Sequence, residues 1–311
     1  MNYLFAVVIP YAAAIVFLVG VVRRIAIWAS APVPFRIPTT CGQQHSLPWI
    51  PSGRLDNPHS ALGVFGRMAL EILCFRSLFR NTRTDLNAGP ALVYGSDKWL
   101  WLGALAFHWS LWIIVIRHLR FFLEPEPRWI LSIRSLDGFF QIGMPVLFAT
   151  DALIVAALIY LFARRLWDRK LRYITLAADY FVLLLIGAIA ATGLLMRHIY
   201  KVDLQQIKDL AMNLARFHPS MPQGVGLIFY IHLFLASALL AYFPFSKLMH
   251  MGGVFLSPTR NLANNSRRRR HRNPWNYEVP VHTYQEYEDE FRQVMLAAGL
   301  PVERDESIKQ E

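Results

Sequence analysis

Five long apolar stretches constrain this chain more than any other feature of its sequence. A helix needs roughly 20 apolar residues to cross about 30 Å of hydrocarbon, and each stretch is long enough to do so. Apolar residues make up 55% of the 311 residues, too many for most soluble proteins. We therefore predict an all-α integral membrane protein, a bundle of five helices. The five stretches are Tyr3–Val22, Trp99–Phe122, Phe139–Phe162, Tyr173–Met196 and Val225–Phe245.

The positive charges predict the orientation of this bundle. The net charge is +11, but the basic residues lie between apolar stretches and not along one soluble face, which argues against nucleic-acid binding. With the N-terminus outside, the inner segments carry 24 of the 32 Lys and Arg residues, as the positive-inside rule requires. The compact basic group at 164–172 is the best indicator, because long loops count for less. We predict a multi-pass protein of the cytoplasmic (inner) cell membrane with a cytoplasmic C-terminus.

These segments divide the chain into four parts. They are a first transmembrane helix (1–22), a cytoplasmic loop (23–98), a four-helix membrane region (99–250) and a polar cytoplasmic tail (251–311). Within the four-helix region we expect helices at 99–122, 139–162, 173–196 and 225–248. The tail carries Arg267–Arg270 and then the acidic stretch Glu286–Glu290, and such charge runs are usually solvated or attracted to anionic lipid.

The loop at 23–98 is too long for a plain connection, which indicates a function. Its first half is rich in proline and predicts no helix. In its second half apolar residues recur at helical spacing, with arginines and Glu71 between them. This pattern is typical of an amphipathic helix, lying either on lipid headgroups or against a partner protein. The apolar positions are Phe65, Met68, Ile72, Phe75 and Phe79.

The two cysteines exclude some redox centres. Cys41 and Cys74 lie far apart and form no CxxC pair, so the chain should hold no iron–sulfur cluster of its own. The sequence also has no CxxCH motif, which excludes covalent attachment of a c-type haem.

Four histidines carry the predicted chemistry. Ionisable residues inside a membrane are costly and therefore indicate function. His108 and His118 lie ten residues apart on the second stretch, while His232 and His250 lie eighteen apart on the fifth stretch and its inner end. Two neutral imidazoles on facing helices can hold one b haem. We predict that all four bind cofactor and ligate metal, as axial ligands of two b haems, with no catalytic residue in the chain itself.

The helix directions pair His118 with His232 and His108 with His250. At 1.5 Å per residue the two spacings are about 15 Å and about 27 Å, so the pairs match in depth only if one ligand lies beyond the regular helix. Pro244 favours such an irregular helix end. His118 and His250 also lie beside charged residues near the interfaces, where a solvated histidine is the plainer interpretation.

Several charged residues near the spans have two interpretations. Asp151 and Asp179 either pair with neighbouring helices or form a proton path. A second group either pairs with haem propionates or a quinone near the outer face, or is simply juxtamembrane. Its members are Arg117, Arg120, Arg128, Arg197 and Lys201.

Five spans with histidines spaced ten and eighteen apart resemble the gamma subunit of respiratory nitrate reductase. The inner segment and two span motifs resemble DsrM, the cytochrome b subunit of the membrane complex associated with dissimilatory sulfite reductase. Arg117 departs from the glycine expected before His118 in the nitrate reductase subunit. The segments that carry the resemblance are Thr40–Trp49, Leu55–Pro58, Gly66–Glu71, Arg76–Asn81, Ala178–Tyr180 and Thr192–Arg197.

The resemblance implies that His108 and His250 hold an inner haem and that His118 and His232 hold an outer one. It also implies a quinone or menaquinone as substrate near the outer haem. The implied partners are a cytoplasmic iron–sulfur subunit of the heterodisulfide-reductase-like DsrK type and other subunits of the Dsr membrane complex, in dissimilatory sulfur metabolism. The chain would then be an electron-transfer subunit of an oxidoreductase complex, not a complete enzyme.

Two other functions are compatible with the sequence. One is the cytochrome b subunit of another quinone-linked oxidoreductase, such as nitrate reductase. The other is a haem-free membrane anchor or transporter with histidines as proton relays. The second is disfavoured because no Gly- or Pro-broken helices recur in corresponding halves of the chain.

Overall fold

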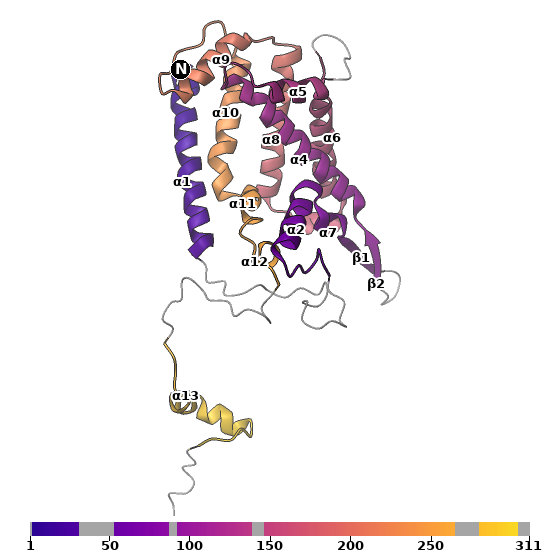
Figure 1. Cartoon of the computed structure of the whole chain (residues 1–311), viewed down its shortest axis with the longest axis vertical. Helices are drawn as coiled ribbons and strands as arrows, with labels where there is room; N and C mark the ends of the chain where they lie inside the picture. Colours follow the sequence, from indigo (N-terminus) through magenta and orange to yellow (C-terminus); the bar gives the residue numbers. More distant parts are fainter. Residues whose placement is uncertain (1, 31–52, 87–91, 139–145, 265–279, 304–311) are drawn as a thin grey trace, which may run out of the picture. The chain divides into compact units, whose positions relative to one another are not determined.

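The computed structural model describes residues 2–30, 53–86, 92–138, 146–264 and 280–303. The chain forms two compact units, one comprising Met1–Ala31 with Phe35–Arg270 and the other Pro32–Pro34 with His271–Glu311. The first unit is a helical bundle (Figure 1). Part of the predicted inner segment, including the Thr40–Trp49 motif, lies outside the described residues.

Long helices run side by side through the bundle (Figure 1). Helix α1 packs on α10, α10 on α8, α8 on α6, and α6 on α4. Their apolar side chains also point outward: Ile15, Val19 and Val22 on α1 are each more than 60% exposed. An outer surface of this kind suits lipid, where only backbones that satisfy their own hydrogen bonds can span. The bounds are Ile9–Ser30 (α1), Lys98–His118 (α4), Ala149–Trp167 (α6), Ala177–His198 (α8) and Leu227–Tyr242 (α10).

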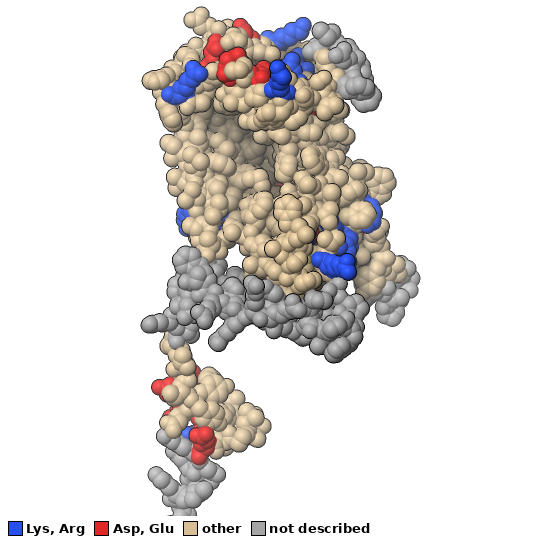
Figure 2. Space-filling view, viewed as in Figure 1, with Lys and Arg blue, Asp and Glu red and all other residues tan. Residues whose placement is uncertain are grey.

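Four helices of the described chain are long and apolar enough to cross a membrane. They are Leu4–Ser30, Lys98–Phe121, Ala177–His198 and Leu227–Phe245. Figure 2 shows the matching pattern on the bundle, with charged residues at its two ends and a band of other residues between them. The chain is therefore a multi-pass membrane protein.

Helix α6 differs from the predicted third span. It begins at Ala149, not at Phe139, and continues to Trp167; residues 139–145 lie outside the described part. Within 19 residues it carries three charged side chains, and Asp151 at its start is buried. The helix packs inside the bundle, but its charge sets it apart from the four apolar helices, so the fifth span stays a prediction.

Helix α1 is longer than predicted because its last turns are amphipathic and not purely apolar. It passes Val22 and ends at Ser30, with the Arg24 guanidinium 5.4 Å from the centre of the Trp28 ring. It follows a π-helical turn, η1 (Leu4–Val8). Pro10 follows at once and has no N–H to donate, a common cause of irregular helix turns.

Two separate apolar clusters are buried in the bundle. One joins Ala6 and Val7 to Leu210, Phe229 and Tyr230, and so ties the start of α1 to α9 (Leu204–Ala215) and α10. The other lies between α4, α6 and α8, and its members are Phe107, Ile154, Ala157, Leu158 and Ile186. Figure 2 shows the surface of the bundle hollowed below the charged cap.

Short elements close both ends of the bundle (Figure 1). At one end lie α5 (Arg128–Asp137) and α9, in segments that the sequence presented only as loops, and the 3-10 turn η2 (Leu119–Phe121), which ends the predicted second span. At the other end lie the remaining elements of the first unit. They are α2 (Ala61–Cys74), α3 (Arg76–Phe79), α7 (Arg169–Ile174), η3 (Phe243–Phe245), η4 (Lys247–Met249), α11 (His250–Gly253), α12 (Pro258–Asn261) and a strand pair.

The described chain also contains one short strand pair, which the all-α prediction did not include. Strand β1 (Thr82–Leu86) pairs antiparallel with β2 (Leu92–Ser96), in a register that runs from Thr82 opposite Ser96 to Leu86 opposite Leu92. The sequence prediction missed it because two five-residue strands with mixed polar and apolar residues give little periodic signal beside the long helices. The bundle is otherwise helical, as predicted.

The predicted amphipathic helix is present, but it is shorter than its apolar pattern. Helix α2 begins after Ser60, whose hydroxyl accepts from the backbone N–H of Gly63, and ends at Phe75, which has a φ of 49°. Phe79 therefore lies on the separate α3. The exposed side of α2 is apolar, since Leu62 and Phe65 are 80% and 71% exposed.

The polar side of α2 is buried instead. Arg67 donates to the Asp56 carbonyl at 2.7 Å, and Glu71 accepts from the backbone N–H and the hydroxyl of Ser77. The Asp56 carboxylate pairs with Arg76 and Arg80. The hydrogen bond from Arg76 lowers the pKa of Asp56, and burial lowers the pKa of Arg67.

The second unit holds one described helix, α13 (Tyr284–Ala297), which contains the predicted acidic stretch. Thr283 and Glu286 form a capping box at its start, which satisfies N–H groups that a helix leaves unpaired. Glu288 is buried and pairs with Arg292, so this acidic run is not wholly solvated. Arg267–Arg270 lie outside the described residues.

Candidate functional site

The four candidate histidines form two groups, which we call the first pair (His108 and His250) and the second pair (His118 and His232). His108 lies in the middle of α4 and His250 at the start of α11, and their ring centroids are 5.9 Å apart with the ring planes at 90°. His118 ends α4 and lies within electrostatic range of His232 on α10. The structure thus brings the two rings of the first pair into contact and the second pair into electrostatic range, while the role of the four histidines as ligands stays a prediction.

In three of the four, the Nδ1 atom is fixed by the backbone of the same segment. The Nδ1 of His108 lies 2.8 Å from the Ala104 carbonyl oxygen, that of His118 lies 2.7 Å from Ile114, and that of His250 lies 2.8 Å from Lys247. Because a carbonyl only accepts, Nδ1 must carry the proton in each. The Nε2 lone pair then remains for a metal, the arrangement usual for ligating histidines.

The fourth, His232, is fixed by another helix. Its Nδ1 lies 2.9 Å from the hydroxyl oxygen of Thr192 on α8. Gly193 is next to Thr192, and a Cβ placed there would lie 3.5 Å from Cε1 of His232. The sequence pointed to Thr192 only as the first residue of the Thr192–Arg197 motif and gave it no role at the site, although a polar residue in the middle of an apolar span was a usable signal.

The first pair fits a b haem by its spacing. Two imidazoles bonded at about 2 Å on either side of one metal ion place their ring centroids about 6 Å apart, close to the 5.9 Å observed. In the described part of the chain no three His, Cys, Asp or Glu side chains converge to hold a bare metal ion. Paired histidines with free Nε2 atoms are the donor set that a bis-histidine haem needs.

Aromatic edges surround His108. The rings of Phe75 and Phe107 meet it edge-on, with centroids at 4.9 Å and 5.1 Å. Phe75 reaches this position from the left-handed residue between α2 and α3. The inner segment is therefore packed directly against the first pair.

Two tryptophans of α4 tie that segment down. The indole N–H of Trp101 donates to the Cys74 carbonyl at 2.8 Å, and that of Trp109 donates to the Leu73 carbonyl at 3.0 Å. These carbonyls end α2, where a helix leaves acceptors unpaired. Both tryptophans therefore join α2 to α4.

His250 reaches the first pair because α10 stops early. The regular helix ends at Tyr242, and 3-10 turns around Pro244 and Lys247 follow before His250. This confirms the irregular helix end expected from Pro244. The Lys247 side chain also pairs with Asp179 at 2.8 Å. Asp179 lies in the first turn of α8 and hydrogen-bonds the Leu176 N–H, so its structural interpretation holds.

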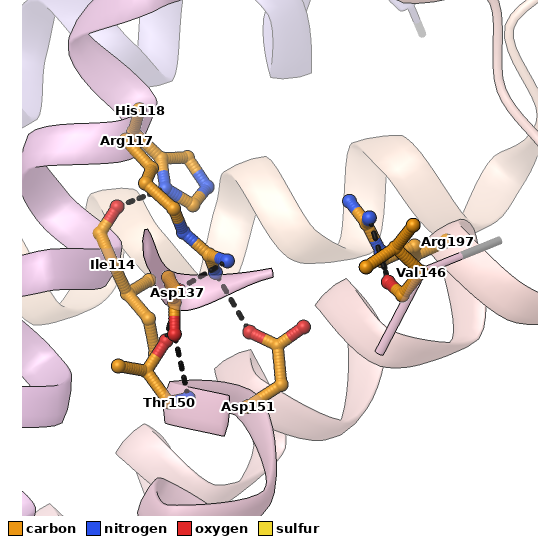
Figure 3. Close-up of polar contacts among 8 residues, drawn as sticks. All are labelled: Ile114, Arg117, His118, Asp137, Val146, Thr150, Asp151 and Arg197. Atoms are coloured by element: carbon orange, nitrogen blue, oxygen red, sulfur yellow. Dashed lines mark hydrogen bonds and ion pairs between the residues drawn. The ribbon is translucent and has the colours of Figure 1, made fainter. Parts of the chain in front are cut away.

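A buried ion cluster lies next to the second pair (Figure 3). Arg117 places Nη1 2.7 Å from Oδ2 of Asp137 and donates from Nη2 to Oδ1 of Asp151 at 2.7 Å. Thr150 donates to Asp137 through both its N–H and its hydroxyl. These contacts join the end of α4 to α5 and to the start of α6, so Asp151 is paired structurally.

A second arginine approaches the same place from α8. Arg197 donates to the Val146 carbonyl from Nε and Nη2, at 3.0 Å and 2.8 Å (Figure 3). Its guanidinium carbon and that of Arg117 lie 4.1 Å and 3.8 Å from the Phe148 ring centre. The two arginines thus differ in their partners: Asp137 and Asp151 balance the charge of Arg117, whereas Arg197 bonds a backbone carbonyl.

Residues 67–271 match the family model described as nitrate reductase gamma subunit. The chain is 44% identical over 288 residues to the Hdr-like menaquinol oxidoreductase cytochrome b-like subunit of Archaeoglobus fulgidus, covering 90% of this chain and 86% of that protein. It is 40% identical over 284 residues to the protein of the same description from Archaeoglobus profundus, covering 88% and 83%.

A more distant relative is a subunit of a respiratory enzyme. The respiratory nitrate reductase 1 gamma chain of Escherichia coli is 28% identical over 167 residues, which cover 49% of this chain and 71% of that one. The family match includes all four candidate histidines and leaves out α1 and the first half of the inner segment.

Proposed function

Because the chain belongs to the nitrate reductase gamma subunit family, we propose that it is the dihaem cytochrome b subunit of a quinone-linked oxidoreductase. The observation that carries the proposal is the pair of histidine pairs. Each of the four imidazoles has its Nδ1 engaged and its Nε2 left for a metal.

In this proposal His108 and His250 hold one haem, and His118 and His232 hold the other. A b haem at each pair would supply one-electron transfer between ferric and ferrous iron. The chain's own residues place and orient these ligands. The backbone carbonyls and Thr192 hold the rings, while the Arg117 cluster joins the helix ends beside the second pair.

We further propose menaquinol or a related quinol as the electron donor, near the second pair. Support comes from the relatives described as menaquinol oxidoreductase subunits. The electrons would leave past the first pair to a cytoplasmic iron–sulfur subunit of the heterodisulfide-reductase-like DsrK type, in a Dsr-type complex of dissimilatory sulfur metabolism. The exposed apolar side of α2, beside the first pair, supports a partner at this end.

The proposed topology is five spans in the cytoplasmic membrane, with the N-terminus outside. Helix α6 is the fifth span, because it packs between α4 and α8 although it carries more charge than the other four. Its basic end, with Arg164 and Arg165, precedes the basic α7. The positive-inside rule places that end in the cytoplasm, together with the first pair.

The test is the reduced-minus-oxidised visible spectrum of detergent-solubilised protein, with pyridine haemochrome quantitation. We expect two b haems per wild-type chain and one in each of the variants His108→Ala and His232→Ala. His218→Ala, a histidine outside the four ligands, should keep both haems. Folded wild-type protein without haem would overturn the electron-transfer function and favour a haem-free anchor or transporter.

A further inference from the structure

Among the described residues, one side-chain hydrogen bond reaches a candidate ligand from another helix, and it joins Thr192 to His232. Thr192 lies on α8, which carries none of the four candidate histidines. Thr192 lies in the middle of α8 and is 8% exposed. Its hydroxyl oxygen is 2.9 Å from Nδ1 of His232, 2.8 Å from the Ala188 carbonyl and 3.0 Å from the Ile189 carbonyl.

These three distances assign the protons. A threonine hydroxyl has a single proton to donate, and two carbonyls that only accept compete for it. The oxygen keeps lone pairs free, so Nδ1 of His232 donates to it. Nε2 of His232 is then the unprotonated nitrogen, available to a metal.

His232 therefore depends on tertiary structure for its orientation. His108 and His118 bond to carbonyls four residues earlier on their own helix, and any histidine with the same rotamer would do so. His232 turns toward α8 and finds its acceptor there. Gly193 keeps that side of α8 free of a side chain close to Cε1 of His232.

We propose that Thr192 is a positioning residue that holds His232 in its ligating orientation and sets the redox potential of the haem at the second pair. This inference rests on the proposed haem function. The physical basis is that an acceptor at Nδ1–H raises the basicity of the ligating nitrogen and stabilises ferric over ferrous iron. A hydroxyl that donates its own proton to a carbonyl is strengthened as an acceptor, because hydrogen bonds in a chain polarise one another. Removing the hydroxyl should therefore raise the potential.

The loss should also weaken cofactor retention. Removing the partner of a metal-ligating histidine typically costs 10–100-fold in metal affinity. Inside a membrane, where water is scarce, an unsatisfied N–H is costly. The effect should fall on the second pair alone, because the three other histidines have backbone partners that a substitution at position 192 leaves in place.

The experiment is a redox titration of both haems in solubilised wild type, Thr192→Val and Thr192→Ser. Valine replaces the hydroxyl by a methyl group of similar size, while serine keeps the hydroxyl. Ser237→Ala is the matched control, because Ser237 is also buried and bonds the Leu233 carbonyl of its own helix, one and a half turns beyond His232.

We expect Thr192→Val to raise one midpoint potential, or to lose that haem about 10–100-fold more readily, with the other haem as an internal reference. Thr192→Ser and Ser237→Ala should match wild type. Two haems with unchanged potentials in Thr192→Val would overturn the proposal. So would equal damage in the serine variant, because packing and not the hydroxyl would then be responsible. Absence of haem from the wild type would instead refute the proposed function.

Discussion

The first and second pairs differ in what surrounds them, although each has one histidine on α4. The first pair lies beside aromatic edges and the inner segment, and both of its rings are fixed by backbone carbonyls of their own segments. The second pair lies beside a buried ion cluster, and one of its rings is fixed by a hydroxyl of another helix.

The protein therefore positions the imidazole rings of the two pairs in two different ways. At the first pair the critical step is to bring His250 back toward α4, which the turns after Tyr242 and around Pro244 achieve. At the second pair the helices are regular and the critical step is orientation. Substitutions should therefore affect one pair and spare the other.

The largest effect should follow from Arg117→Gln at the second pair. The change leaves the buried carboxylates of Asp137 and Asp151 without their shared cation, and breaking a buried ion pair typically costs about 3–5 kcal/mol. We expect a loss of about that size in the free energy of unfolding, measured in mixed detergent micelles, and earlier loss of haem from the second pair.

Arg128→Gln is the control for that change. Arg128 lies at the exposed start of α5, and surface substitutions usually stay within about 0.5 kcal/mol. Equal destabilisation by the two variants, or equal haem loss at both pairs, would contradict a role for the ion cluster at the second pair.

An intermediate effect should follow from Gly20→Ala, which acts on the first pair. A Cβ at position 20 would lie 2.6 Å from Cβ of Pro244, and the proline ring cannot swing away. Helix α1 would be pushed from the turn that leads to His250, at a cost of about 1–3 kcal/mol typical of overpacking. The first haem's spectrum and stability should change, while those of the second should not.

Gly187→Ala separates this clash from a general effect of alanine. A Cβ at position 187 of α8 meets no atom within 4 Å, so alanine should be neutral or stabilise by about 0.4–1 kcal/mol. If both glycine variants lose the same stability by thermal denaturation, close packing of α1 on Pro244 is not what holds the first pair.

The smallest effect should be a pH dependence of the segment beside the first pair. The Arg76 hydrogen bond lowers the pKa of Asp56, so Asp56 stabilises the fold above its unfolded pKa of about 3.9. That contribution is lost as the pH falls through the lower folded value. The protection of α2 and α3 amides from hydrogen exchange, taken relative to the intrinsic exchange rate at each pH, should therefore fall below about pH 4.

Asp56→Asn should remove this acid dependence by leaving no carboxylate to protonate. Glu290→Gln, an exposed position on α13, should leave it unchanged. If protection near the second pair falls at the same pH as in α2, the acid effect is global and not specific to Asp56.

Much of the architecture could be predicted from local sequence. The apolar stretches predicted four membrane-length helices to within a few residues, apart from the longer α1. The spacing around Phe65 and Met68 predicted α2. These predictions succeed because helix length, apolar periodicity and the cost of a buried ionisable group are properties of short segments.

Other features had no local signal. The sequence did not predict the β1–β2 pair, the helical caps α5 and α9, or the late start of α6 at Ala149. The ion cluster joins Arg117, Asp137 and Asp151, which are distant in sequence. Pairing of this kind depends on how helices pack, which periodicity does not specify.

The sequence by itself determined a helical membrane chain with four histidines at haem-compatible spacings. Only the tertiary structure decided that His250 meets His108 after an irregular helix end, and that Nδ1 of His232 meets the hydroxyl of Thr192 on another helix. The physical reason is range: hydrophobic length acts within one helix, whereas the direction of an imidazole depends on a hydrogen-bond partner that only packing brings near.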